Sequence, residues 1–127
     1  MFIISERING QFISVGKAID NRDSKFIQEL ALKQVDSGAQ ALDVNVGPGR
    51  DMTWLVSTVQ EVTEVPLCID AFGPKTMEAG VKACNNPIIM NSTNADPARM
   101  EKYFPICREY NADIICLCMD EKGIPNS

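Results

Sequence analysis

Residues 41–48 read ALDVNVGP, a short and largely apolar run that ends in a Gly-Pro turn signal. Four similar runs lie at residues 2–4, 67–70, 88–91 and 114–119. Their apolar residues are nearly continuous rather than alternating, which is typical of parallel strands that are buried on both faces. The sequence therefore predicts strands of a parallel sheet at these positions.

Helical patterns separate the runs, and each pattern has a recognisable start. The expected starts are Asp23 or Ser24, Asp51, Pro74 and Asp96-Pro97. The apolar stripes of these helices are Ile27, Leu30, Ala31 and Val35; Leu55, Val59 and Val62; Met77, Val81 and Cys84; and Met100, Tyr103, Phe104 and Cys107. Gly38 is expected to stop the first helix. Pro105 lies inside the last pattern, where it predicts a kink or an early break.

The alternation of strands and helices requires a parallel sheet with right-handed crossovers. A doubly wound open sheet and part of a TIM-type (β/α)₈ barrel both fit, and the pattern alone does not choose between them. A complete barrel needs about 250 residues, about twice this chain. The barrel interpretation therefore takes residues 1–127 as its N-terminal half, from the first strand to the fifth.

Composition excludes several classes of protein. Apolar residues make up 45% of the chain, charged residues 23%, and the formal net charge is −5. The basic residues form no stripe, so nucleic acid is not an expected partner. The chain has no long apolar run and no signal-peptide pattern, so we expect neither a membrane span nor secretion, and we predict a cytoplasmic protein.

The chain contains no histidine and five cysteines, without a CxxC pair. Catalysis by a Ser-His or Cys-His pair is therefore excluded, and no metal site is predicted. Cys116 and Cys118 fall on one face of a predicted strand, where a metal pair is one interpretation and small buried hydrophobic residues are the favoured one.

Polar side chains end four successive predicted strands, where both α/β architectures bind ligands. They are Glu6 and Asn9, then Asp43 and Asn45, then Asp70, then Asn91. Asp and Asn are poor strand formers and are costly to bury without partners, so their recurrence indicates a polar ligand across this rim.

Each of these residues also has a purely structural interpretation. Asp43 and Asn45 point the same way and could brace loops. Asp70 could be a turn residue, Asn91 could cap the next segment, and Glu6 could pair with Arg7. No GxGxxG or GxxxxGK[ST] motif follows the first strand, which lowers the weight of a doubly wound nucleotide-binding sheet.

Four segments carry a resemblance to a known family: ISERING at residues 4–10, LDVNVGP at 42–48, LCID at 67–70 and NSTNA at 91–95. In this order and spacing they resemble the methyltetrahydrofolate:corrinoid methyltransferases of the pterin-binding superfamily. That superfamily includes dihydropteroate synthase, which fits less well because its Asn-Val-Thr-Pro-Asp-Ser-Phe opening is absent. The resemblance runs the length of the chain and implies the TIM-type barrel.

The resemblance implies that Asp70 and Asn91 hold the pterin and are the catalytic residues of this half. The chemistry agrees, because a carboxylate can accept two parallel N–H donors and an amide can donate and accept at once. Asp43, Asn45, Asn9 and Glu6 align with rim positions and are also predicted to contact the pterin.

The implied reaction moves a methyl group between N5 of methyltetrahydrofolate and the cobalt of a corrinoid on a partner protein. The resemblance also implies a homodimer for the full-length protein. The family's other pterin-binding Asp and its N5-facing Asn belong to the second half of the barrel, so residues 1–127 alone are expected to be inactive. The alternatives are another pterin enzyme, such as dihydropteroate synthase, and a non-catalytic open-sheet α/β binding domain.

Overall fold

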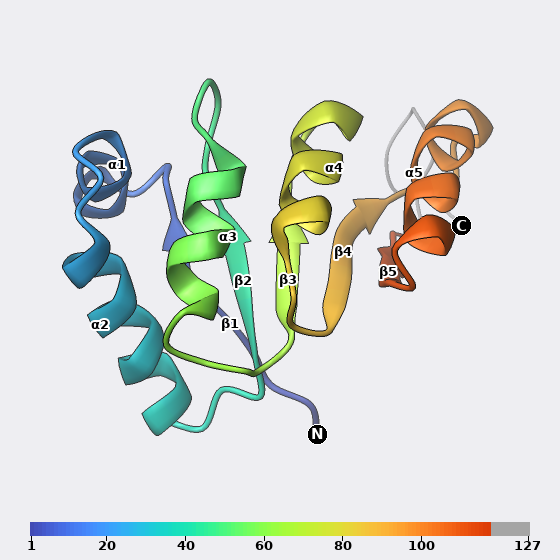
Figure 1. Cartoon of the computed structure of the whole chain (residues 1–127). Helices are drawn as coiled ribbons and strands as arrows, with labels where there is room; N and C mark the ends of the chain where they lie inside the picture. The colour runs from blue at the N-terminus through green and yellow to red at the C-terminus, as the bar shows by residue number, and fades with distance from the viewer. Residues whose placement is uncertain (118–127) are drawn as a thin grey trace, which may run out of the picture.

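The computed structural model describes residues 1–117, which form five strands and five helices (Figure 1). The strands are β1 (Ile4–Asn9), β2 (Ala41–Asn45), β3 (Leu67–Asp70), β4 (Ile88–Thr93) and β5 (Asp113–Cys116). The helices are α1 (Ile13–Asp20), α2 (Ser24–Asp36), α3 (Met52–Gln60), α4 (Pro74–Ala83) and α5 (Pro97–Glu109).

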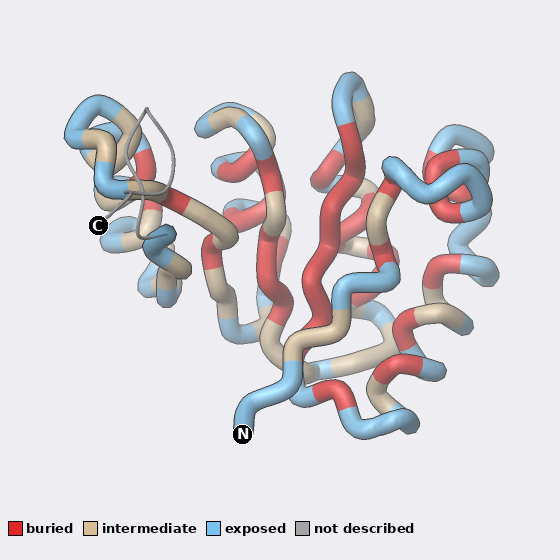
Figure 2. The backbone as a smooth tube through the Cα atoms, turned by 180° about the vertical axis from the view of Figure 1, so that it is seen from behind, coloured by how far each residue is buried: buried red, intermediate tan, exposed pale blue. Residues whose placement is uncertain are grey.

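The strands form one parallel sheet in the order β1-β2-β3-β4-β5. Helices α2 to α5 form one layer, each contacting the next, on the side of the sheet that faces the viewer in Figure 1. From behind, the strands lie in front of the helices (Figure 2). A doubly wound sheet would have helices on both faces and a reversal of strand order. The α/β fold is therefore part of a TIM-type barrel, as predicted, and the open doubly wound alternative is wrong.

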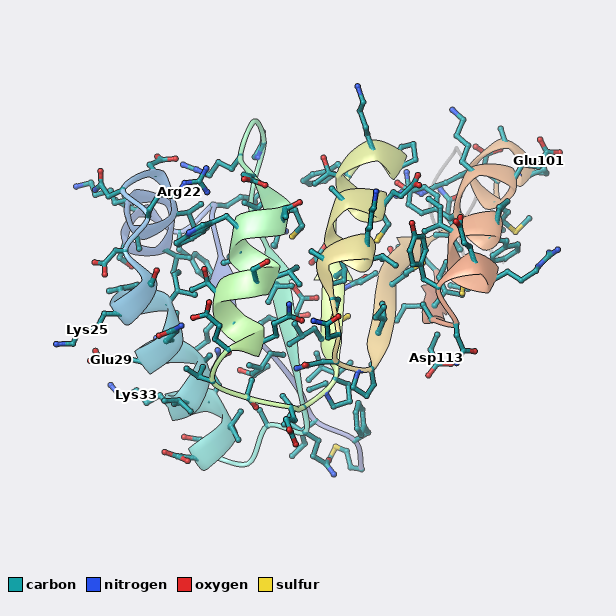
Figure 3. The ribbon with its side chains drawn as sticks, viewed as in Figure 1. Arg22, Lys25, Glu29, Lys33, Glu101 and Asp113 are labelled. Atoms are coloured by element: carbon teal, nitrogen blue, oxygen red, sulfur yellow. The ribbon has the colours of Figure 1, made fainter. Side chains whose placement is uncertain are left out.

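The hydrophobic core lies between the sheet and this helix layer. Leu42 and Val44 of β2, and Leu67 and Ile69 of β3, are fully buried there. Gly80 of α4 permits the close approach of helix and sheet, because a Cβ at this position would lie 2.7 Å from the Ile69 side chain. The outer face of α2 is charged, with Lys25, Glu29 and Lys33 projecting away from the sheet (Figure 3).

The predicted helix starts are confirmed by hydrogen bonds. The side chain of Asp23 accepts from Phe26 N at 3.1 Å, that of Asp51 from Trp54 N at 3.3 Å, and that of Asp96 from Ala98 N at 3.2 Å. Pro74 opens α4, whose N-cap is Gly73. These local signals were readable because an N-cap side chain satisfies an amide of its own helix.

The first strand was predicted a few residues too early, and the helix that follows it was not predicted. β1 begins at Ile4 and continues through polar residues to Asn9, while Phe2 and Ile3 are exposed; within residues 1–117, β1 pairs with β2. Helix α1 was not predicted at all. Its N-cap, Phe12, makes no capping hydrogen bond and Gly16 lies in its middle, so it carries neither a start signal nor high helix propensity.

The early break at Pro105 is also wrong, since α5 continues as one helix to Glu109. Tyr103 and Ile106 are buried on either side of the proline, and this tertiary packing outweighs the local cost. Cys116 is exposed on the edge strand β5, so its prediction as a buried residue fails; Cys118 lies outside the described residues. None of the helices within residues 1–117 has both the length and the hydrophobicity needed to cross a lipid bilayer.

Candidate functional site: the open face of the sheet

The face of the sheet away from the helices carries the polar residues. Side chains alternate between the two faces of a strand. Because Leu42, Val44, Leu67, Ile69 and Met90 pack in the helix-side core, their neighbours point to the open face. These open-face residues are Asp43 and Asn45 of β2, Cys68 and Asp70 of β3, and Asn91 of β4.

Asp43 lies at the centre of this group. Only 3% of its surface is exposed, and its Oδ2 accepts a hydrogen bond of 2.8 Å from Nδ2 of Asn91. This bond crosses β3, whose Cys68 pairs with Asp43 in the sheet register and whose Asp70 pairs with Asn91. Three predicted site residues, Asp43, Asp70 and Asn91, are thus brought together from three strands.

The environment of Asp43 favours its protonated form. Burial first, and the neighbouring Asp70 carboxylate second, raise the pKa of its carboxyl from the usual 3.8 to about 7, against the opposing hydrogen bond from Asn91. The pKa of the Cys68 thiol is raised strongly, first by burial and then by Asp43, so Cys68 is a neutral neighbour rather than a nucleophile. A carboxyl that titrates near neutrality can hold or release a proton under physiological conditions.

A cavity of about 650 Å³ opens beside this group and brings together four predicted site residues: Glu6, Asn9, Asp43 and Asp70. It also extends past Arg7 and round the free edge of β1 to Phe26 of α2. A second cavity of about 270 Å³ is lined by Asn45, by Asp70 and by the loops that follow β2 and β3. Asp70 lines both cavities and is therefore the residue on which they converge.

Asn9 and Asn45 have structural roles in the rim loops. Oδ1 of Asn45 accepts from Gly47 N at 3.0 Å, and Oδ1 of Asn9 accepts from Gln11 N at 2.9 Å. Gly10 N also donates to Asn45 O at 2.7 Å, which joins the two loops. The loop-bracing interpretation therefore holds for Asn45 but not for Asp43, whose side chain bonds to Asn91 on β4.

Two of the other structural interpretations are not supported. Within residues 1–117 no salt bridge joins Glu6 to Arg7. Asn91 donates to Asp43, while Asp96 caps the helix that follows. The N-cap of α4 is Gly73. The interpretation of Asp70 as a turn residue stays a prediction.

Two arginines at the site were not identified from the sequence. Arg50 binds the rim loops: its Nε donates to Asp20 at 2.7 Å and its Nη1 donates to Gly10 O at 3.0 Å. Arg99 of α5 donates to Ser92 O at 3.0 Å, directly after Asn91. No sequence signal marks either residue, because their partners lie in other segments of the chain.

A model of the pterin binding enzyme family matches residues 9–126. The chain belongs to this family. The chain is also 32% identical over 134 aligned residues to a methylcorrinoid:tetrahydrofolate methyltransferase from Eubacterium limosum. The alignment covers the whole chain and 49% of that relative, so the chain spans about half of the relative's length.

Proposed function

We propose that this chain contributes the pterin-binding side of a methyltransferase that moves a methyl group between N5 of methyltetrahydrofolate and the cobalt of a corrinoid on a partner protein. One observation carries the proposal: Asp43, Asp70 and Asn91, from three successive strands, meet on the open face of the sheet. The similarity to the methylcorrinoid:tetrahydrofolate methyltransferase of Eubacterium limosum supports the choice of substrates.

The residues present suit a reduced pterin. Asp70, at the convergence of the two cavities, offers carboxylate oxygens to the adjacent N–H and amino groups of the pyrimidine ring. Asn91 offers a neutral amide that can both donate and accept. Asp43 titrates near neutrality and can hold a proton in the same group. The cobalt of the corrinoid supplies or receives the methyl group.

The activity of a whole protein is part of this proposal, because the chain spans about half of its relative. We propose that a further pterin-binding Asp and an Asn facing N5 come from the remaining half of the barrel. We also propose that the full-length protein is a homodimer. Residues 1–127 then supply mainly ground-state binding of the pterin, and the remaining half supplies transition-state stabilisation.

The test is Asp70→Ala in the intact protein, with methyltetrahydrofolate titrated by calorimetry. The substitution removes an acceptor of two N–H groups from a partly buried position, so we expect a loss of about 2–4 kcal/mol of binding free energy. Asp113→Ala, on the exposed start of β5, is the matched control and should bind like the wild type. Unchanged affinity in Asp70→Ala would remove Asp70 from the site and, with it, the proposed function.

A further inference from the structure

The contact between Asp43 and Asn91 determines how the Asn91 amide is turned. An ionised carboxylate only accepts hydrogen bonds, so the amide must direct Nδ2 toward it. With Nδ2 held at 2.8 Å from Asp43 Oδ2, the amide oxygen Oδ1 points away from β2. The Asn91 amide then presents its oxygen as an acceptor and its second N–H as a donor to a ligand, and the positions of the two are fixed.

Asp43 is much more deeply buried than the two predicted site residues beside it. It is 3% exposed, whereas Asp70 and Asn91 are only partly buried and more open to a ligand. Cys68, its partner in the sheet register, is fully buried. Asp43 also lines the cavity of about 650 Å³, but a larger part of Asp70 and of Asn91 is accessible on the open face.

We infer that Asp43 is a positioning residue, whose carboxylate sets the order of donor and acceptor that Asn91 presents to the ligand. This inference rests on the proposed function and deepens it, because it specifies what Asn91 recognises. The ligand edge must place an N–H donor opposite Oδ1, as the ring of a reduced pterin or another lactam-type heterocycle can. A heterocycle with the reverse order of donor and acceptor is disfavoured.

When Asp43 is protonated, it no longer fixes the orientation of the Asn91 amide. A neutral carboxyl has an O–H that can donate to Oδ1, so the Asn91 amide can turn over. The groups that face Asp43 are Asp70 and Cys68 from β3 and Asn91 from β4, while Glu6 and Arg7 of β1 line the same cavity. Ionised Asp43 is the binding form, so affinity is expected to be full above neutral pH and to fall as the pH decreases through about 7.

A double-mutant cycle on the intact protein tests the inference, with methyltetrahydrofolate titrated by calorimetry at pH 8. Asp43→Asn leaves the Asn91 amide free to turn and should weaken binding by about tenfold. In an Asn91→Ala background the same change should have less than about a twofold effect, since no amide remains to be positioned. A full tenfold effect in that background would mean that Asp43 touches the ligand itself, which overturns the inference. Asp23→Asn is the control, because Asn is an equally good N-cap for α2.

A second measurement uses the wild-type protein without a ligand, so it does not depend on whether a variant folds. In the wild-type protein, the side-chain ¹⁵N–¹H signals of Asn91 should shift with pH along a single titration near neutrality, which reports Asp43. Signals that stay constant between pH 5.5 and 8.5 would overturn the inference, whatever the protein binds. If the signals titrate but methyltetrahydrofolate does not bind the wild type, the positioning role stands and the proposed function fails.

Discussion

The two faces of β2 are built from alternate residues of one short strand, yet they have opposite chemistry. Leu42 and Val44 are fully buried against the helix layer. Asp43 and Asn45 are almost as well buried on the other face, but each is polar and hydrogen-bonded. The helix-side residues supply apolar burial, which stabilises the fold. The open-face residues are costly to bury without partners; Asp43 has one in Asn91 of β4, and Asn45 has one in Gly47 of its own loop. The comparison indicates that apolar burial and polar hydrogen bonding alternate residue by residue along this strand, with the proposed ligand on the polar face.

The largest change in the free energy of unfolding is expected for a substitution on the helix side of the sheet. Ile69 is fully buried and lies against Gly80 of α4, so Ile69→Ala leaves a cavity that the surrounding residues cannot fill. We expect it to lower the free energy of unfolding by about 2–5 kcal/mol in urea titrations. Cys68→Ala, the adjacent residue on the open face, removes less volume and should cost about 1 kcal/mol. Equal losses for the two variants would contradict the separation of the two faces.

On the open face we expect a smaller change in the free energy of unfolding, and it should be a gain rather than a loss. The folded-state pKa of Asp43, about 7, lies above the usual value of 3.8. The stabilisation associated with its protonation is therefore fully present below about pH 4 and is lost as the pH rises through about 7. Asp43→Asn cannot ionise, so at pH 8 it should be more stable than the wild type by roughly 1–3 kcal/mol.

Comparing the stability of Asp43→Asn with that of the wild type at pH 4 is the control, because Asp43 in the folded wild type is neutral at that pH. Denaturant titrations at both pH values should show the two proteins converging at pH 4. A variant that is less stable than the wild type at pH 8 would mean that Asp43 stabilises the fold. Together with the expected loss of ligand affinity, a gain at pH 8 would show that Asp43 is retained for recognition at a cost in stability.

The sequence predicted the helix side of this comparison better than the open side. Three N-caps were identified because the signal lies within a few residues of the helix it starts. Helix α1 was missed because it has no such signal, and α5 continues past Pro105 because of packing that only the tertiary structure provides. Local capping signals thus located most of the helices, whereas the continuation of α5 depends on long-range packing.

On the open face, the sequence identified the residues but not their relations. Asp43, Asp70 and Asn91 were identified because polar residues at strand ends are unusual. The hydrogen bond between Asp43 and Asn91 joins residues 48 positions apart, and it depends on the register of three strands. The near-neutral pKa of Asp43 depends on the same register, since Asp70 contributes to it. Neither property is encoded in any single segment.

The smallest expected effect concerns the rim, where the loops after β1 and β2 meet on Arg50. Its guanidinium donates to Asp20, to Gly10 O and, at 3.4 Å, to Val46 O. Glycine is required around it: Gly47 has a φ of +81°, and a Cβ there would lie 2.8 Å from Arg50 Nη1. Arg50 thus connects the two loops that carry Asn9 and Asn45.

Arg50→Lys retains the charge but replaces the planar fork of donors with a single ammonium group that cannot reach both loops and Asp20 in the same geometry. Because Arg50 and Asp20 are accessible to water, their ion pair itself adds little stability. We therefore expect little change in global stability, but faster amide hydrogen exchange at Gly10, whose N–H bonds to Asn45 O. The amide of Ile69 in β3 should exchange as in the wild type, since its protection follows global unfolding. Equal acceleration at Gly10 and Ile69 would show that Arg50 supports the whole fold; acceleration at Gly10 alone would assign it to the rim of the open face.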